Sequence, residues 1–183
     1  WMYYAAGETK KDKGFKHWLK YKLGEPPVLL EDVNQDNVRS LMSERAFNLG
    51  HFKATTTHQT EIKDKEASVT YTVEVDKPYR IDTVIFPADS HALAQKIIQT
   101  RKETLLNPGE LYDLSRVDQE RERIRQHLMN KGYYYFSPSY LYFEADTTTM
   151  GKRVNLFLKL KEDAPQKALI PYRINEIYLY TNY

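Results

Sequence analysis

The sequence contains no cysteine, which excludes disulfide cross-links and chemistry that depends on a thiolate. It also lacks a glycine-rich phosphate loop, and glycine accounts for only 7 of the 183 residues. No apolar run approaches the ~20 residues that a membrane-spanning helix needs. Neither sign of charge dominates, because 27 basic and 25 acidic side chains give a formal net charge of +2. This balance does not provide the clustered basic surface on which nucleic-acid binding depends.

The N-terminus has neither an initiator methionine nor a signal peptide, since the chain begins with Trp1. We therefore expect the sequence to be part of a longer protein. A cysteine-free chain suits the cytosol and a periplasm equally, so composition leaves the compartment open. With 41% hydrophobic and 28% charged residues the chain should fold, and its length suits one ordinary domain or two small ones.

One arrangement of residues occurs twice: a helix pattern, then a glycine, then strand patterns. The positions at helical spacing are Val38, Leu41, Met42 and Arg45 in the first copy, and Leu114, Val117, Ile124 and Leu128 in the second. Gly50 follows the first helix pattern and Gly132 follows the second. Because the chain must turn abruptly into a strand, we predict that both glycines are left-handed helix caps with positive φ.

After each glycine the sequence predicts two strands joined by a turn. In the first copy the strands are expected over residues 52–62 and 68–75. In the second copy the outgoing strand is expected over residues 133–143, and the return strand over 153–161 carries Phe157 on its outer side. Pro138 has no amide hydrogen to donate to a sheet, so the outgoing strand is expected at a sheet edge or at a bulge.

Each return strand is followed by the same phrase, "PYRI", which begins at Pro78 and again at Pro171. With a further helix pattern over residues 90–100, the repeat predicts α+β units of order β-α-α-β-β. The predicted domains are residues 1–76, whose first strand is truncated to about residues 1–4, residues 77–165, and residues 166–183, which form a linker and the first strand of a further unit.

Lys77, Pro78 and Tyr79 form the predicted hinge between the first two units. Pro78 has a fixed φ and biases Lys77 toward an extended conformation, so the hinge should be stiff.

This order of elements resembles the POTRA domain, and the resemblance covers nearly the whole chain. The stretches that carry it are the helix ends "AFNLGHF" and "LMNKGYYYF", the repeated "YRI" of the first strand, and "WLKYKLGEPPVLL" with "ERERIRQHLMNKGYYYFSP". These stretches are similar to the periplasmic part of BamA/TamA-like outer-membrane assembly proteins. The resemblance implies tandem modules, each a small three-stranded mixed sheet with two helices on one face.

The resemblance also implies a function and a location. It implies a periplasmic scaffold in a Gram-negative bacterium that receives unfolded outer-membrane proteins or accessory subunits. The parent protein's own membrane barrel would then lie downstream, in the outer membrane. It implies neither an active site nor a cofactor.

Edge strands are the predicted binding sites, because an extended segment of another chain can pair with their free backbone groups. The candidate residues are Lys53, Thr55 and Thr57 in the first unit, and Tyr140, Leu141, Tyr142, Phe143 and Phe157 in the second. The alternative is that these residues face water or pack on a neighbouring module.

No constellation for catalysis or metal binding is recognised. The five histidines show no metal-ligand spacing on one helix, so we expect neither an enzyme nor a metal site. Glu120, Arg121, Glu122 and Arg125 are interpreted as a solvated helix face.

A nucleic-acid-binding module is the alternative function. In this reading Tyr133 and Tyr135 would lie on a sheet and stack against bases. The balanced charge disfavours it, because phosphate binding requires clustered lysine and arginine.

Overall fold

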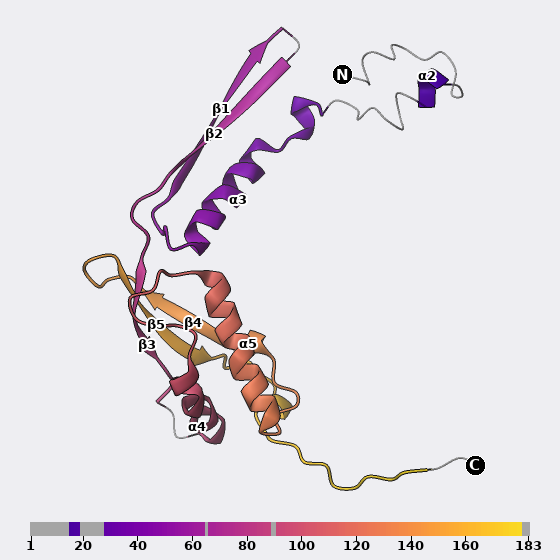
Figure 1. Cartoon of the computed structure of the whole chain (residues 1–183), viewed down its shortest axis with the longest axis vertical. Helices are drawn as coiled ribbons and strands as arrows, with labels where there is room; N and C mark the ends of the chain where they lie inside the picture. The colour runs from indigo at the N-terminus through magenta and orange to yellow at the C-terminus, as the bar shows by residue number, and fades with distance from the viewer. Residues whose placement is uncertain (1–14, 19–27, 65, 89–90, 181–183) are drawn as a thin grey trace. The chain divides into compact units, whose positions relative to one another are not determined.

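The computed structural model describes residues 15–18, 28–64, 66–88 and 91–180 (Figure 1). The chain divides into two compact units. One contains the described residues up to Leu41 together with Thr57–Thr72, and the other contains Met42–Thr56 and the described residues from Val73 onward. The domain boundaries and the stiff hinge that the sequence predicts stay predictions.

The first copy of the repeat is built from one long helix and a hairpin. Its elements are α2 (Phe15–Trp18), η2 (Leu30–Asp32), α3 (Gln35–Asn48), β1 (Thr55–Lys63) and β2 (Glu66–Glu74). The side chain of Asn34 caps α3 by accepting a hydrogen bond from the amide of Asn37 at 2.9 Å. β1 and β2 pair as a two-stranded sheet. The first strand predicted near residues 1–4 lies outside the described residues.

The hairpin of the first copy begins later than the sequence predicts. Phe52 lies before β1, in a turn, and its ring packs against the rings of Tyr79 and Tyr112 at centroid distances of 4.9 and 5.0 Å. Leu41, which was placed on the buried stripe of the helix, is exposed. The buried face of α3 is therefore narrower than the helical spacing of its apolar residues predicts.

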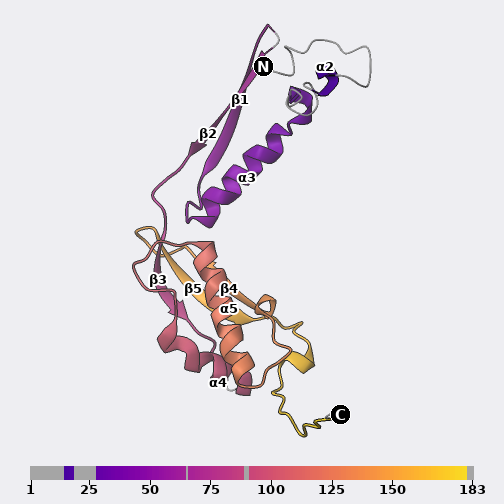
Figure 2. The same ribbon diagram turned by 45° about the vertical axis from the view of Figure 1, so that its right-hand side comes forward.

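The second copy has the complete order β-α-α-β-β (Figures 1 and 2). Its elements are β3 (Arg80–Ile85), α4 (Ala92–Gln99), η3 (Thr100–Glu103), α5 (Leu114–Asn130), η4 (Pro138–Tyr140), β4 (Leu141–Asp146), β5 (Arg153–Leu160) and η5 (Gln166–Ala168). The sheet has the strand order β3-β5-β4, with β3 parallel and β4 antiparallel to β5. The predicted α+β class and mixed three-stranded sheet are confirmed.

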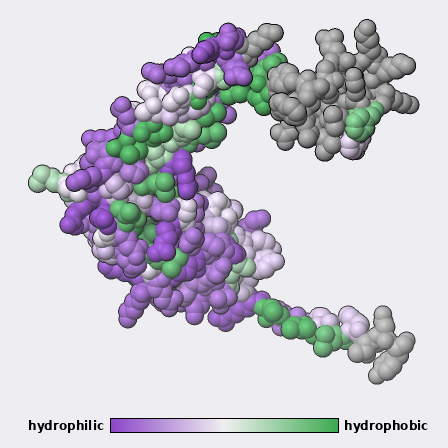
Figure 3. Space-filling model, turned by 45° about the horizontal axis from the view of Figure 1, so that its top comes forward, coloured by the Kyte–Doolittle hydropathy of each residue, from purple (hydrophilic) through white to green (hydrophobic). Residues whose placement is uncertain are grey.

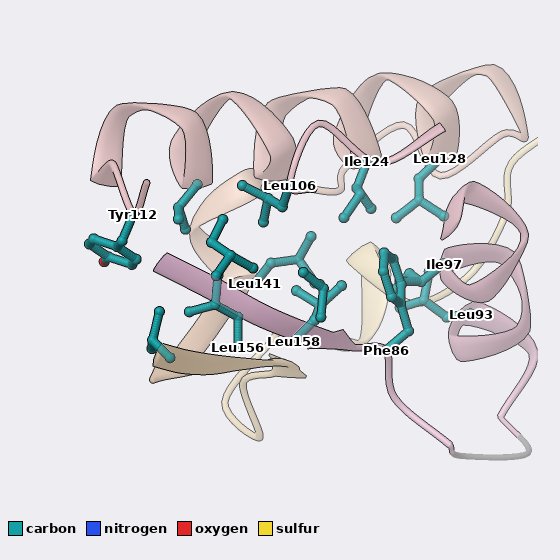
Figure 4. Packing of buried hydrophobic residues seen from close by; sticks show 14 of the residues in the cluster. Phe86, Leu93, Ile97, Leu106, Tyr112, Ile124, Leu128, Leu141, Leu156 and Leu158 are labelled. Carbon is teal, nitrogen blue, oxygen red and sulfur yellow. The ribbon is translucent and has the colours of Figure 1, made fainter. Parts of the chain in front are cut away.

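The core of the second copy lies between the sheet and the two helices (Figure 4). Every second residue of β5, namely Val154, Leu156 and Leu158, is buried, as the alternation in the sequence predicts. The helices contribute Leu93, Ile97, Ile124 and Leu128. Burying one such side chain contributes about 1.5–3 kcal/mol relative to exposing it. The sheet is therefore held to its helices by one continuous apolar layer.

Tyr133 to Phe136 do not form the strand that the sequence predicts. The chain turns after Gly132, and the side chains of Tyr133 and Phe136 are buried in the core beyond the end of α5. Pro138 then begins η4, with the hydroxyl of Ser137 accepting from the amide of Ser139. The strand starts only at Leu141, because these aromatic residues close the end of the core instead of pairing in the sheet.

The strand expected after Pro171 is also not formed, because residues 171–180 have no strand pairing. Ile174, Ile177 and Leu179 are strongly exposed, and Figure 3 shows a hydrophobic stretch along this segment, shortly before its grey end. Within the described residues, no helix combines the length and apolar character needed to cross a membrane.

Candidate binding edge

β4 is a terminal strand of the second-copy sheet. Among the described residues it pairs only with β5, from Leu141 opposite Leu160 to Asp146 opposite Asn155. One side of its backbone is therefore not used by the sheet. This is the geometry that strand addition requires, because an incoming chain needs unpaired amide and carbonyl groups.

The register decides which backbone groups are available. The amide of Lys161 donates to the carbonyl of Tyr140 at 2.8 Å, so these two residues form a hydrogen-bonded pair. Hydrogen-bonded and non-bonded pairs alternate along an antiparallel ladder. The backbone groups of Leu141, Phe143 and Ala145 must therefore point away from β5.

These three residues differ in whether their amides are available to an added strand. The amide of Leu141 already donates to the carbonyl of Pro138, as the end of η4. The amides of Phe143 and Ala145 are the two donors that β4 presents outward. Ala145 is exposed, whereas Leu141 is fully buried and Phe143 packs against the core.

The outer face of the sheet, opposite the helices, carries mixed side chains. Tyr142 is 38% exposed and lies opposite Lys159, and Glu144 lies opposite the half-buried Phe157. Lys159 and Glu144 form an ion pair across the two strands, and this hydrogen bond raises the pKa of Lys159 above its usual value. Two aromatic rings and one ion pair thus border the edge.

An apolar groove of about 720 Å³ adjoins the start of β4. Its lining includes Ile85, Phe86, Ala94, Tyr142, Phe157 and Leu169. The groove provides apolar surface on the same end of the sheet as the predicted site.

The structure brings the second set of predicted site residues together. Leu141, Tyr142 and Phe143 lie in β4, Tyr140 ends η4 directly before it, and Phe157 lies on the neighbouring strand. Whether they bind a partner stays a prediction.

In the first copy, Lys53 lies before β1 and is not part of the strand, whereas Thr55 and Thr57 occupy exposed positions within it. β1 remains the second candidate edge strand.

Glu120 is buried, although the sequence predicts that it lies on a solvated helix face. It is 0% exposed, accepts a hydrogen bond from the amide of Leu105 at 3.0 Å, and is paired with Arg123 at 2.6 Å. The interpretation as a solvated face is therefore wrong for Glu120. Its spacing between Val117 and Ile124 places it on the apolar stripe of α5, and that was the available signal.

The structure removes the basis of the nucleic-acid alternative. Tyr133 is 3% exposed and Tyr135 lies in a loop, so neither ring is presented by a sheet. The described part of the chain also contains no cluster of three or more side chains suited to a metal ion.

Comparison with known proteins finds a family match within the second copy. Residues 95–163, from α4 to just beyond β5, match the family model of POTRA, described as "Surface antigen variable number repeat". This segment is therefore similar to POTRA domains. None of the curated proteins compared with the chain matches it.

Two solved structures resemble the chain. The crystal structure of Haemophilus influenzae BamA POTRA3-5 is 18% identical over 69% of this chain and 47% of that one, with a TM-score of 0.42. BamA from Haemophilus ducreyi lacking POTRA domains 1–3 is 14% identical over 71% of this chain and 24% of that one, with a TM-score of 0.46. The chain spans less than half the length of either structure.

Proposed function

We propose that the chain is part of a periplasmic scaffold of an outer-membrane protein insertion or translocation machine. In this proposal the free edge of β4 receives extended segments of unfolded outer-membrane proteins or of accessory subunits. The chain acts by binding and not by catalysis. The POTRA match of residues 95–163 supports the scaffold role.

The main support for this binding site is the terminal position of β4 in its sheet, with the amides of Phe143 and Ala145 pointing outward. Main-chain pairing gives affinity with little sequence preference, which suits a receiver of many different strands. We expect micromolar or weaker affinity, since ordering an extended peptide costs about 2–5 kcal/mol.

The test is an NMR titration of the ¹⁵N-labelled chain with a peptide of about ten alternating apolar and polar residues, as in an outer-membrane barrel strand. We expect amide shifts at Phe143 and Ala145. Ala145→Pro removes one outward donor without removing a core side chain, and proline is tolerated on an edge strand. Because one hydrogen bond contributes about 1 kcal/mol, the variant should bind about fivefold more weakly.

Ala145→Val is the matched control, because it keeps the amide and favours a strand. It should bind like the wild type. Leu141→Pro is less informative, since Leu141 is fully buried and its amide is already used. Equal binding by folded Ala145→Pro and Ala145→Val would reject the β4 edge. Shifts confined to Thr55–Lys63 would instead identify β1 as the receiving strand.

A further inference from the structure

β5 is longer than the strand that pairs with it on one side. β3 pairs with β5 only as far as Ile85, which lies opposite Phe157. On its other side β5 pairs with β4 as far as Leu160, which lies opposite Leu141. Residues 158–160 of β5 therefore have a neighbouring strand on one side only. We call the side of these residues that faces away from β4 the β5 overhang.

The register shows which backbone groups the β5 overhang presents. Lys161 and Tyr140 form a hydrogen-bonded pair, with the amide of Lys161 donating to the carbonyl of Tyr140 at 2.8 Å. Hydrogen-bonded and non-bonded pairs alternate along an antiparallel ladder, so the backbone of Lys159 is also bonded to β4. The backbone groups of Leu158 and Leu160 therefore point away from β4, toward the side on which β3 has ended.

Pro87 prevents β3 from continuing along β5. In a parallel ladder the amide of Leu158 donates to the carbonyl of Ile85, and the carbonyl of Leu158 would accept from the amide two residues after Ile85. That residue is Pro87, which has no amide hydrogen. Within the described residues, no backbone hydrogen bond therefore reaches the carbonyl of Leu158 or the amide and carbonyl of Leu160.

The unpaired carbonyl of Leu158 has the greatest need for a partner. Leu158 is 2% exposed, so water has little access to its carbonyl. A buried carbonyl without a hydrogen bond costs free energy, and a donor on a bound ligand removes this cost. The β5 overhang therefore favours a ligand that supplies an N–H group.

The apolar groove of about 720 Å³ lies along the β5 overhang. Its apolar lining comes from three elements: Leu158 and Leu160 of β5, Ala94 and Ile97 of α4, and Phe86 and Pro87 directly after β3 (Figure 4). An extended peptide in such a groove can pair its main chain with the strand edge and place alternate side chains against the apolar lining. The groove thus supplies side-chain contacts next to the unpaired backbone groups.

The charged lining of the groove is mainly basic. It contains His91, Lys159 and Lys161 against a single acidic residue, Glu162. Lys159 is already paired with Glu144 on the outer face of the sheet. Lys161 is exposed and forms no ion pair within the described part of the chain. An acidic side chain on a ligand would therefore find an available partner in Lys161.

We propose that the groove along the β5 overhang binds a short extended segment of a partner polypeptide, apolar in its centre and acidic at its ends. A few of its residues continue the line of β3, and one of its amides donates to the carbonyl of Leu158. A polypeptide fits better than an acyl chain, because only a polypeptide supplies both a donor for Leu158 and an acceptor for the amide of Leu160. The site lies on the opposite side of β5 from β4, so it is independent of strand addition at β4.

The experiment titrates the ¹⁵N-labelled full chain with a capped peptide of the order Glu-Val-Leu-Val-Glu, followed by NMR. Its matched control is Lys-Val-Leu-Val-Lys, which differs only in the sign of its charges. We expect shifts at Leu158 and Leu160, and binding of the acidic peptide at least about threefold tighter than that of the basic one. Lys161→Glu should reverse this preference, whereas Lys167→Glu, outside the groove, should leave it unchanged.

Hydrogen exchange tests the backbone pairing directly. In the free chain the unpaired amide of Leu160 should exchange faster than that of Lys159, which is bonded to β4. When the acidic peptide occupies nine-tenths of the sites, exchange at Leu160 should slow by about tenfold, because only the free tenth of the chains then exchanges.

Three results would overturn the proposal. One is equal binding of the two peptides, and another is a preference for the acidic peptide that Lys161→Glu leaves intact. The third is unchanged exchange at Leu160 when the acidic peptide is bound. Laurate provides a further arm: shifts at Ala94 and Leu158 with laurate, and with neither peptide, would assign the groove to an acyl chain instead.

Discussion

The carbonyl oxygen of Gly132 and the amide of Tyr172 are 2.7 Å apart, and this hydrogen bond joins the end of α5 to the segment that follows η5. Gly132 has a φ of 94°, in the left-handed region that the sequence predicts for it. A Cβ atom there would lie 2.7 Å from the carbonyl oxygen of Tyr172. Glycine is therefore required twice at this position, by its φ and by the close approach of a second backbone.

Gly132→Val should destabilise the second copy of the repeat more than Gly151→Val does. Both glycines have positive φ, 94° and 86°, so both variants cost roughly 1–2 kcal/mol from backbone conformation. Only Gly132 faces a neighbouring backbone, since no described atom lies within 4 Å of a Cβ at Gly151. Urea denaturation measures the difference, and faster hydrogen exchange at the Tyr172 amide should accompany it. Equal destabilisation with unchanged exchange at Tyr172 would contradict this account.

Glu120→Ala should be strongly destabilising, by about 3–5 kcal/mol, because it leaves Arg123 without its buried partner. Glu120→Gln should cost less, since its side-chain oxygen can still accept from the amide of Leu105. Glu122→Ala is the control, because the Glu122–Arg125 pair is partly exposed and should contribute less than about 1 kcal/mol. Thermal denaturation of the three variants tests this order. A similar cost for Glu120→Ala and Glu122→Ala would show that burial of Glu120 is not important.

The ion pair of Asp76 and Lys152 should make stability depend on pH. Two hydrogen bonds lower the pKa of Asp76 below its ordinary value of 3.8. The larger effect comes from the side chain of Lys152 and the smaller one from the amide of Lys77. A carboxyl whose pKa is lower in the folded state stabilises above its unfolded pKa, and this contribution is lost as the pH falls through the folded pKa. The stability difference between wild type and Asp76→Asn should therefore be largest near neutral pH and disappear in acid below 3.8.

Denaturation at several pH values measures that difference. Lys152→Met provides the control, because in its background Asp76→Asn should produce a smaller pH-dependent change. An unchanged difference between pH 7 and pH 3 would exclude a role for the pair.

Phe52 and Tyr112 should be energetically coupled. Their rings are 5.0 Å apart in an edge-to-face arrangement, which typically contributes about 0.5–1.5 kcal/mol beyond the area that the rings bury. A double-mutant cycle with Phe52→Leu and Tyr112→Leu measures this coupling. A second cycle with Phe52→Leu and Phe136→Leu, in which no ring contact joins the two residues, should be additive within about 0.5 kcal/mol. Additivity in the first cycle as well would show that the contact between the two rings contributes no coupling energy.

The sequence alone was sufficient for the elements whose signal is local. α5 was predicted from the spacing of Val117, Ile124 and Leu128, and β5 from the alternation of Leu156 and Leu158; the structure confirms both. The positive φ of the two cap glycines was also predictable. A helix stripe, a strand alternation and a left-handed cap each depend on residues only a few positions apart, so their pattern is complete within a short stretch.

Only the tertiary structure decided which apolar segments pair and which polar groups are buried. Tyr133 and Phe136 have the composition of a strand, yet their side chains are buried in the core beyond the end of α5 instead of pairing in the sheet. Glu120 is enclosed because Leu105 and Arg123 satisfy its carboxylate from other turns of the chain. Residues 174–180 have strand-forming composition but no partner among the described residues, whereas β4 has a partner on one side and a free edge on the other. A strand depends on partners that are distant in sequence, so local pattern cannot determine it. The helical spacing of Glu120 indicates the buried side of α5, but the amide of Leu105 that satisfies its carboxylate comes from a distant part of the chain.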